Sequence, residues 1–468
     1  MTTELLSYSL IPLLAALFIP FLGRRNTRIT EVLANVTLLA GLANLSFIIF
    51  HPHNRANDYS TFSFDGFTML MLFTIYLVAL CVVFFSSVSR MGEFNRNAFY
   101  PLIMISVSAM SSMVLARDFF SLYIFMEALA VTSFALIACE EKQSGIEAAL
   151  KYLLLTFPAS ALIIVGIAIM TFISGSLYFD MSTVSVWNAS PAGFVALALI
   201  VLGFSIKAGL FPFHFWTPDA YQGASASVSA YLAGIVTKVS GMYALIKICM
   251  MLRIMGPSAL KISAALMFIG VATLIFASIA ALAQKDFKRM LAFSSISQMG
   301  YIAAGAATLN PIGILGAILH LFNHATFKTT LFLNGAAIEK SLGTTDMRKM
   351  GGMEKNMPFT SWTSVVALFS TAGVPPLSGF WSKLLIILAL WVTGAKTFAV
   401  LALLFSIVTL AYFMVMQKKV FFGRPKEEFR EVMEAPFPML APVVLMSLII
   451  VFSGIFFPYV FEFLEKTL

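Results

Sequence analysis

Charge is scarce in this sequence. Of its 468 residues, 11% are Asp, Glu, Lys or Arg, 60% are hydrophobic, and the mean hydropathy is +0.92. A soluble domain usually has about 25% charged residues. The apolar residues form blocks of about 20, long enough to cross a lipid bilayer as helices. The composition therefore excludes a soluble protein and predicts an all-α, polytopic membrane protein.

Cysteine is also scarce, and the motifs of common cofactors are missing. Cys81, Cys139 and Cys249 lie apart in apolar blocks, without a CxxC pair. Zinc and iron–sulfur sites need clustered ligands, so these cysteines are predicted to be small core residues. The chain also lacks the Rossmann glycine fingerprint and the Walker A loop. We expect no cofactor, no metal and no catalytic residue, so energy has to come from partner proteins.

The apolar blocks predict about fourteen transmembrane spans. The first block has Glu4 before it and arginines after it, the reverse of a signal peptide, so it is predicted to be a retained helix. The block at 359–393 is too long for one straight span and contains Gly373-Val-Pro-Pro376, which predicts a broken helix. The spans are predicted near 5–23, 29–50, 66–88, 98–116, 118–138, 147–174, 192–213, 222–249, 259–283, 288–309, 311–335, 359–393, 396–420 and 437–464.

The basic residues predict an orientation for these spans. With the N-terminus outside, the cytoplasmic loops hold 18 of the 30 Lys and Arg residues, and the outside loops and tails hold six. This asymmetry follows the positive-inside rule. We therefore expect a multi-pass protein of a prokaryotic inner or cell membrane, with its N-terminus outside.

The remaining six basic residues are lysines inside apolar blocks. Glu127 is the one acidic residue clearly within a span, and His214, His320 and His324 add titratable rings at membrane depth. A charge at the bilayer centre costs about 2.5–3.5 kcal/mol on insertion scales, so such residues need interior partners and indicate function. Two of the lysines, Lys151 and Lys247, lie near span ends, where extending to the interface is an equal alternative. The six are Lys151, Lys207, Lys238, Lys247, Lys328 and Lys383.

Glu127 and one of these lysines form a candidate proton switch. A lysine removed from water holds its proton less tightly, and a nearby carboxylate restores its affinity. A pairing of Glu127 with Lys207 in one state, released in another, would give a proton site with two affinities. Freed Lys207 would then pass its proton towards Lys238 or water.

The histidines His320 and His324 lie four residues apart on one helical face, and Lys328 follows after four more. Imidazole titrates near neutral pH, so the stripe predicts a proton or water relay. Structural hydrogen bonding is the main alternative. Metal binding is disfavoured because no acidic or cysteine ligand stands at a suitable spacing.

Two breaks interrupt the predicted spans 7 and 12. They are Lys207-Ala-Gly-Leu-Phe-Pro212 and Gly373-Val-Pro375-Pro376. Proline frees a backbone carbonyl, which is tolerated at membrane depth where water or protein satisfies it. Interrupted helices in matching positions mark ion sites in many transporters, and an offset of five spans makes the two units inverted. Packing kinks are the alternative explanation.

Five sequence segments together resemble one family of membrane subunits. It comprises the antiporter-like subunits of respiratory complex I, the D-type subunit of Mrp antiporters and the large membrane subunits of energy-converting hydrogenases. The resemblance covers roughly residues 60–425. The segments are Phe125-Met-Glu127-Ala, Phe211-Pro-Phe-His-Phe-Trp-Thr-Pro-Asp-Ala-Tyr-Gln-Gly-Ala224, Lys285-Asp-Phe-Lys288-Arg-Met-Leu-Ala-Phe-Ser-Ser-Ile-Ser-Gln-Met-Gly-Tyr301, His320-Leu-Phe-Asn-His324-Ala-Thr-Phe-Lys328 and Ala372-Gly-Val-Pro-Pro-Leu-Ser-Gly-Phe-Trp-Ser-Lys383.

The resemblance implies fourteen helices, with helices 4–8 and 9–13 as inverted five-helix repeats and helices 7 and 12 broken. The implied division is 1–96 for helices 1–3, 97–250 for the first repeat, 251–422 for the second and 423–468 for helix 14. It also implies a lateral hydrophilic axis for protons. The implied pathway residues are Glu127, Lys151, Lys207, His214, Lys238, His320, His324, Lys328 and Lys383, with helix breaks at Pro212, Pro375 and Pro376.

The resemblance further implies a proton-translocating subunit of a redox-driven pump, with other membrane subunits and peripheral redox subunits as partners. Two alternatives stay open at this point. One is a self-sufficient sodium/proton antiporter, and the other is a quinone-handling redox enzyme. The motifs are shared by several family branches, so the parent complex and its electron donor stay open as well.

Overall fold

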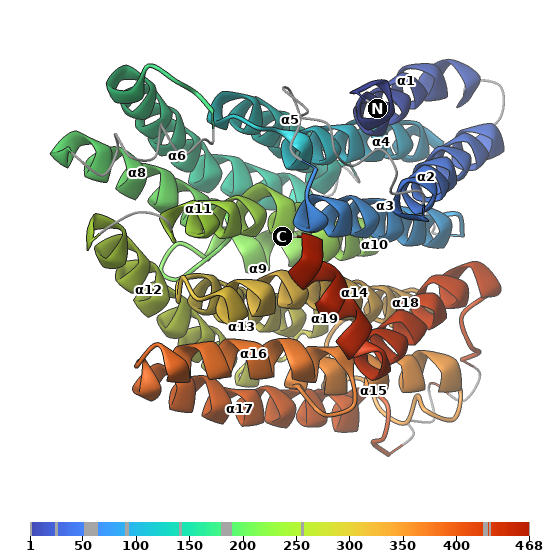
Figure 1. The fold of residues 1–468 in the computed structure, drawn as a ribbon. Helices are drawn as coiled ribbons and strands as arrows, with labels where there is room; N and C mark the ends of the chain where they lie inside the picture. Colours follow the sequence, from blue (N-terminus) through green and yellow to red (C-terminus); the bar gives the residue numbers. More distant parts are fainter. Residues whose placement is uncertain are drawn as a thin grey trace.

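The structure is a computed structural model that describes residues 2–23, 27–50, 64–88, 93–139, 143–178, 190–253, 257–424, 429 and 432–467. Across these ranges it is nearly all helical. Most helices run side by side along one direction, and the short C-terminal helix crosses them at an angle (Figure 1). Two isolated backbone bridges, and no strand, occur in the ranges given above.

Apolar composition sets the helices and capping residues set several of their starts. Asp65, Asp118, Ser190, Asp286 and Asn310 each accept a hydrogen bond from a backbone N–H of the first turn. The helices of the first half are α1 (Thr2–Gly23), α2 (Thr27–Phe50), α3 (Gly66–Ser86), α4 (Glu93–Leu115), α5 (Phe119–Ala138), α6 (Gln143–Ser174), α8 (Pro191–Lys207), α9 (Trp216–Gly223), α10 (Ala226–Tyr231), the π-helical segments η2 (Leu232–Val236) and η3 (Lys238–Tyr243), and α11 (Ala244–Leu252).

The second half continues the same pattern. Its helices are α12 (Pro257–Leu282), α13 (Phe287–Ala306), α14 (Pro311–Leu342), α15 (Pro358–Ala372), α16 (Ser378–Val392), α17 (Lys396–Val420), α18 (Phe437–Ile455) and α19 (Phe457–Thr467).

Ten of the described helical stretches are long and apolar enough to cross a membrane. The other four predicted spans correspond to α8 with α9, to α13, to α14, and to α15 with α16. Two of these are broken, and the other two contain lysine, histidine, glutamine or asparagine side chains. The all-α, multi-pass membrane architecture is therefore confirmed, and the predicted spans that depart from plain apolar helix are those with the polar residues or the breaks.

Helices 7 and 12 are broken, as the sequence predicts. α8 ends at Lys207 and α9 starts at Trp216, while α15 ends at Ala372 and α16 starts at Ser378. In both breaks a glycine with positive φ, Gly209 or Gly373, stands three residues before a cis proline, Pro212 or Pro376. Glycine adopts this left-handed conformation without a steric penalty.

Several of the predicted span boundaries are wrong. The predicted span 192–213 stops before α9, and the predicted span 222–249 begins inside α9. The predicted span 437–464 is two helices, because α18 ends at Ile455 and α19 begins at Phe457, next to Pro458. Proline at the second position of a helix is compatible with a new start rather than with a continuing helix. The predicted span 311–335 is also too short, since α14 continues to Leu342 and includes Glu339.

The chain repeats one helical unit at a constant spacing. α5 and α13 both have 20 residues, and α6 and α14 both have 32. In each unit the long helix ends at a glycine with positive φ, and the chain then forms a backbone bridge to the aspartate that caps the shorter helix. The matching residues, each pair 168 positions apart, are Asp118 and Asp286, Gly175 and Gly343, and Tyr178 and Asp346.

Candidate functional site

Lys207 is the last residue of α8 and its side chain is 2% exposed. Its Nζ lies 3.1 Å from Glu127 Oε1 on α5, within hydrogen-bond distance. Gly241 of η3 packs on the backbone after Lys207, because a Cβ built on Gly241 would lie 2.5 Å from the Ala208 nitrogen. The break in helix 7 therefore holds the end of α8 between α5 and the middle of helix 8. The predicted contact is present, and its role as a switch stays a prediction.

Lys238 lies at the centre of helix 8, the stretch from α10 to α11, and is fully buried. It is the first residue of η3, and π-helical turns are frequent at functional sites. Its Nζ donates to the Ala233 carbonyl and, at 3.2 Å, to Thr237 Oγ1. Thr237 Oγ1 lies 2.9 Å from the Tyr221 hydroxyl. No acidic side chain of the described ranges forms an ion pair with Lys238.

The polar face of α14 consists of buried residues bonded to neutral groups. His324 Nε2 lies 3.2 Å from Ser295 Oγ. Lys328 Nζ donates to Ser294 Oγ at 2.7 Å, and the Tyr412 hydroxyl donates to the same oxygen at 2.8 Å. The ammonium of Lys328 is thus placed by hydroxyl groups rather than by a carboxylate.

His320 links α14 to the helix 12 break. Its Nδ1 lies 2.9 Å from Ser382 Oγ and its Nε2 lies 3.2 Å from Gln298 Oε1. Asn323 Nδ2 donates to the same Ser382 oxygen at 3.0 Å and to the Ser378 carbonyl at 2.9 Å. The side chains of α14 therefore hold the start of α16 in place.

Lys383 follows the helix 12 break and is 3% exposed. Its Nζ lies 4.4 Å from the centroid of the Tyr301 ring, a cation–π contact, and forms no hydrogen bond with any described group. Gly373 leaves room for its chain, since a Cβ built there would lie 3.1 Å from Lys383 Cδ.

These groups lie within electrostatic range of one another across the two halves of the molecule. His324 is within the field of Lys238 and Lys328, and Lys383 acts on both His320 and Lys328. We call this set the buried polar axis. It consists of the buried residues Lys207, Lys238, His324, Lys328, His320 and Lys383, together with Glu127, whose side chain is 32% exposed.

Two predicted pathway residues lie off this axis. The Lys151 side chain is 46% exposed and pairs with Glu147 at 2.7 Å and with Asp219 at 3.1 Å. His214 is buried among aromatic rings of the helix 7 break and the neighbouring helices, and its Nδ1 bonds to no described group. Their roles in a pathway stay predictions.

The structure also pairs charges that the sequence left unpaired. Lys247 Nζ lies 2.5 Å from Asp65 Oδ2, so Lys247 is neutralised by a carboxylate rather than by the interface alone. Lys288 pairs with Glu339 at 2.7 Å. Both pairs join residues distant in sequence, and nothing local in the sequence predicts either pairing.

Among the described residues, no group of three or more His, Cys, Asp or Glu side chains is placed to hold a metal ion. Cys81 and Cys249 are buried, and Cys81, Cys139 and Cys249 form no disulfide.

The chain is similar to known membrane proteins. Residues 116–409 match the model of the family described as NADH:quinone oxidoreductase/Mrp antiporter, TM. The chain is 30% identical over 401 residues to the D-type subunit of the Na⁺/H⁺ antiporter of Alkalihalophilus pseudofirmus, covering 85% of this chain and 81% of that protein. It is 34% identical over 383 residues to the N-type subunit of the NADH-quinone oxidoreductase of Desulforudis audaxviator, covering 77% and 75%.

The fold agrees with a solved structure as well. A chain of the archaeal membrane-bound sulfane sulfur reductase matches with a TM-score of 0.88 and 26% identity, covering 100% of this chain and 97% of that one. Family model, relatives and fold give one answer: the chain belongs to the family of NADH:quinone oxidoreductase and Mrp antiporter membrane subunits.

Proposed function

We propose that this protein translocates protons as a membrane subunit of a redox-driven ion pump. The observation that carries the proposal is a row of four buried lysines, of which Lys207 alone pairs with a carboxylate within the described residues. An ammonium at bilayer depth without a counter-ion costs several kcal/mol. Release of the proton removes this cost, so these lysines are suited to release and rebind protons. The other three are Lys238, Lys328 and Lys383.

The pair of Glu127 and Lys207 is the proposed switch. Contact at 3.1 Å favours charged Lys207, and separation leaves it desolvated without a counter-charge. The proton then moves to Lys238, onward to the histidines and Lys328 of α14, and leaves through Lys383. This order runs along the membrane plane, between the two helical units.

The energy comes from outside this chain. Moving one charge against 100 mV costs about 2.3 kcal/mol. The names of two relatives, an NADH-quinone oxidoreductase subunit and a chain of a sulfane sulfur reductase complex, support redox partners. We propose that other membrane subunits bind this chain directly and that peripheral redox subunits drive it.

The proposed topology has the N-terminus outside, supported by the 18 basic residues that this orientation places in cytoplasmic loops. The proposed division is 1–96, 97–250, 251–422 and 423–468. The two central parts correspond to the units that repeat at a spacing of 168 residues.

The second candidate function is sodium/proton exchange without redox partners. It is favoured by the similarity to the D-type subunit of an Na⁺/H⁺ antiporter. Sodium prefers oxygen ligands, and the buried polar axis includes Glu127 as its one carboxylate among the described residues. The lysine-rich axis therefore favours protons.

Reconstitution distinguishes the two candidates. The affinity-purified complex is placed in liposomes with a pH-sensitive dye and supplied with the electron donor that its co-purified redox subunits oxidise. We expect donor-dependent proton uptake, and no sodium-dependent proton exchange by the purified chain alone. Robust exchange by the chain alone would replace the first proposal with the second.

A further inference from the structure

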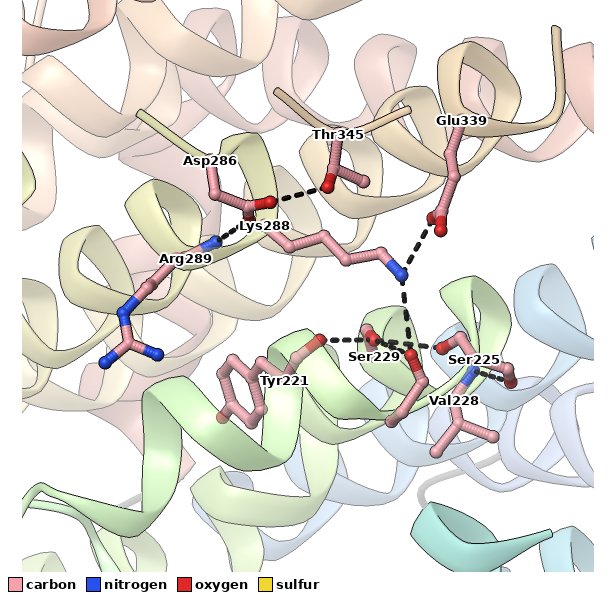
Figure 2. Close-up of polar contacts among 10 residues, drawn as sticks. Tyr221, Ser225, Val228, Ser229, Asp286, Lys288, Arg289, Glu339 and Thr345 are labelled. Carbon is pink, nitrogen blue, oxygen red and sulfur yellow. Dashed lines mark hydrogen bonds and ion pairs between the residues drawn. The ribbon is translucent and has the colours of Figure 1, made fainter. Parts of the chain in front are cut away.

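An ion pair stands where helix 10 begins and helix 11 ends. Lys288 is the second residue of α13, and its Nζ lies 2.7 Å from Glu339 Oε2 near the end of α14 (Figure 2). The Lys288 side chain is 7% exposed, whereas that of Glu339 is 35% exposed. The pair thus has one buried member and one that is accessible from the surface.

The ammonium of Lys288 also contacts the break between α9 and α10. It lies 3.4 Å from the carbonyl oxygen of Ala224, which is in an extended conformation with ψ 157° between the two helices. The Ser229 hydroxyl donates to the carbonyls of Tyr221 at 2.7 Å and Ser225 at 2.9 Å on the same break (Figure 2). Lys288 therefore covers a stretch of backbone in which side chains bond the carbonyls of Tyr221 and Ala224, whereas the Ser225 carbonyl also accepts from the Ser229 backbone N–H at 2.8 Å.

Tyr221 connects this break to the centre of the membrane. Its carbonyl belongs to the polar cluster under Lys288, and its hydroxyl lies 2.9 Å from Thr237 Oγ1. The same oxygen accepts a hydrogen bond from Lys238 Nζ at 3.2 Å. Tyr221 thus has its backbone carbonyl in the polar cluster beside Lys288 and its hydroxyl in the hydrogen-bonded group beside Lys238.

The neighbouring acidic residue has a different arrangement. Asp286 accepts from the Arg289 backbone at 2.9 Å and from the Thr345 hydroxyl at 2.5 Å, so its carboxylate is occupied by capping (Figure 2). Glu339 has Lys288 as its ion-pair partner and keeps an exposed face. If Lys288 only covered the break, its contact with the Ala224 carbonyl would be sufficient, and a partly exposed acid beside it would not be needed.

We infer that Glu339 and Lys288 form the mouth of the proton inlet that supplies Lys238. This inference rests on the proposed function. Glu339 takes a proton from the aqueous phase and, once neutral, releases Lys288 from the ion pair. Water then reaches the break at Ala224 and takes the proton from Glu339, which becomes a carboxylate again and re-pairs with Lys288. The Tyr221 and Thr237 hydroxyls relay this proton to the neutral amine of Lys238, which becomes an ammonium. Lys288 is a positioning residue for this transfer, and the Tyr221 hydroxyl is a relay group.

A double-mutant comparison tests the inlet in the whole complex reconstituted in liposomes. Glu339→Gln removes the acid, and Tyr221→Phe removes the inner hydroxyl while keeping the ring. We expect each change to slow proton uptake about tenfold, the effect of losing one charged hydrogen bond or its equivalent. Because both residues act on one route, the double variant should be no slower than the slower single variant.

The controls separate the inlet from a structural contact and from the proposed function. Asp346→Asn changes an acid that pairs with Arg348 in the loop after α14 and should keep the wild-type rate. Two results would overturn the inlet. One is a double variant slowed by the product of the two single effects, and the other is a single variant that keeps the wild-type rate. Wild-type vesicles without donor-dependent proton uptake would overturn the proposed function and the inlet together. If Glu339→Gln does not assemble, Glu339→Ala takes its place in the same comparison. Failure of both to assemble assigns the pair a structural role and overturns the inlet.

Discussion

The unit from α5 to α9 and the unit from α13 to α16 share a backbone and differ in charge. The spacing of 168 residues places Glu127 of the first unit opposite Ser295 of the second. The glycines of the two breaks are 164 positions apart, which places Lys207 opposite Thr371. The first unit therefore has an acid–base pair where the second has two hydroxyls.

The long helices reverse this distribution. His320, His324 and Lys328 of α14 stand opposite Tyr152, Thr156 and Ser160 of α6. After the breaks, Lys383 stands opposite Asp219, which lies 2.7 Å from Arg289 and 3.1 Å from Lys151. The second unit has a histidine or lysine at all four positions. The first unit has hydroxyl groups at three of them and, at the fourth, Asp219, an acid held by two cations.

The difference in charge fits the proposal that two units with similar backbones have separate roles, one as a switch and one as a relay. A lysine with a carboxylate partner has two states that depend on one distance, which suits a switch. Lysines and histidines held by hydroxyl and amide groups exchange protons without a large change in ion pairing, which suits a relay. A duplicated backbone thus provides each variant with a matched control in the other unit.

The largest effect is expected at the switch. Glu127→Gln or Lys207→Ala should slow proton uptake by about a hundredfold or more, the contribution of a positioned proton-transfer group. The matched control in the second unit is Ser295→Ala, which should retain most of the activity. Proton uptake by the reconstituted complex measures all three. Near-normal rates in both switch variants would refute the division of tasks.

Lys383 and Lys151 sharpen the comparison between buried and exposed lysines. Lys383→Met should slow proton uptake at least about tenfold, because it removes a buried ammonium from the end of the relay. Lys151→Met removes a 46% exposed ammonium and should change the rate by less than about twofold. Equal effects would place Lys151 on the pathway after all.

A smaller effect is expected at Ser382, which bonds both His320 and Asn323. Ser382→Ala should slow proton uptake about fivefold, since a neutral hydrogen bond contributes about 1 kcal/mol. Ser447→Ala in α18 is the control, because the buried Ser447 hydroxyl bonds to no described residue. An unchanged rate for Ser382→Ala would remove the hydroxyl from the relay.

The two glycines Gly209 and Gly175 test the breaks by stability. Both have φ of 70°, but a Cβ built on Gly209 would lie 2.6 Å from Thr217 Oγ1, and one on Gly175 would meet nothing within 4 Å. Gly175→Ala should cost about 1–2 kcal/mol from backbone strain alone, and Gly209→Ala should cost more. Melting temperatures in detergent measure both effects. Equal melting temperatures for the two variants would show that the helix 7 break has room for a methyl group at Gly209.

The smallest effect is a pH dependence at Asp346. The hydrogen bonds from Arg348 hold the pKa of the Asp346 carboxyl well below its usual range. A lowered pKa in the folded state means stability that is present above about pH 4, the unfolded value, and lost as the pH falls. Because the pair is exposed, Asp346→Asn should lower the melting temperature at pH 7 by only about a degree, and this difference should shrink as the pH falls below about 4. A difference that persists unchanged at low pH would assign the loop a role in packing.

Most of the fold could be predicted because each element has a local cause. Runs of apolar residues identify the spans, and Gly209 with Pro212 or Gly373 with Pro376 identifies the breaks. The end of the fourteenth predicted span was harder to predict from the sequence, because Phe456, Phe457 and Pro458 continue an apolar block where α18 ends and α19 begins.

The charged groups were harder to place because their partners are distant in sequence. Glu127 and Lys207 are separated by 80 residues and could be paired only because Glu127 is the one acid within a span and through the family resemblance. Nothing local predicts that Lys247 bonds Asp65, 182 residues away, or that Glu339 reaches Lys288. The hydroxyls of Ser294 and Ser382 gave no signal either, because serine is common in membrane helices.

The packing of α19 has a practical consequence for labelling. Thr467 sits against Gly66, the residue after Asp65, so tightly that Gly66 leaves no space for a side chain. A fluorescent protein or affinity tag fused directly after this helix would strain the Asp65 N-cap of α3 and the ion pair between Lys247 and Asp65. A long glycine–serine spacer keeps such a handle mechanically separate from the helix. Purification and imaging of the complex are therefore best begun with spaced fusions.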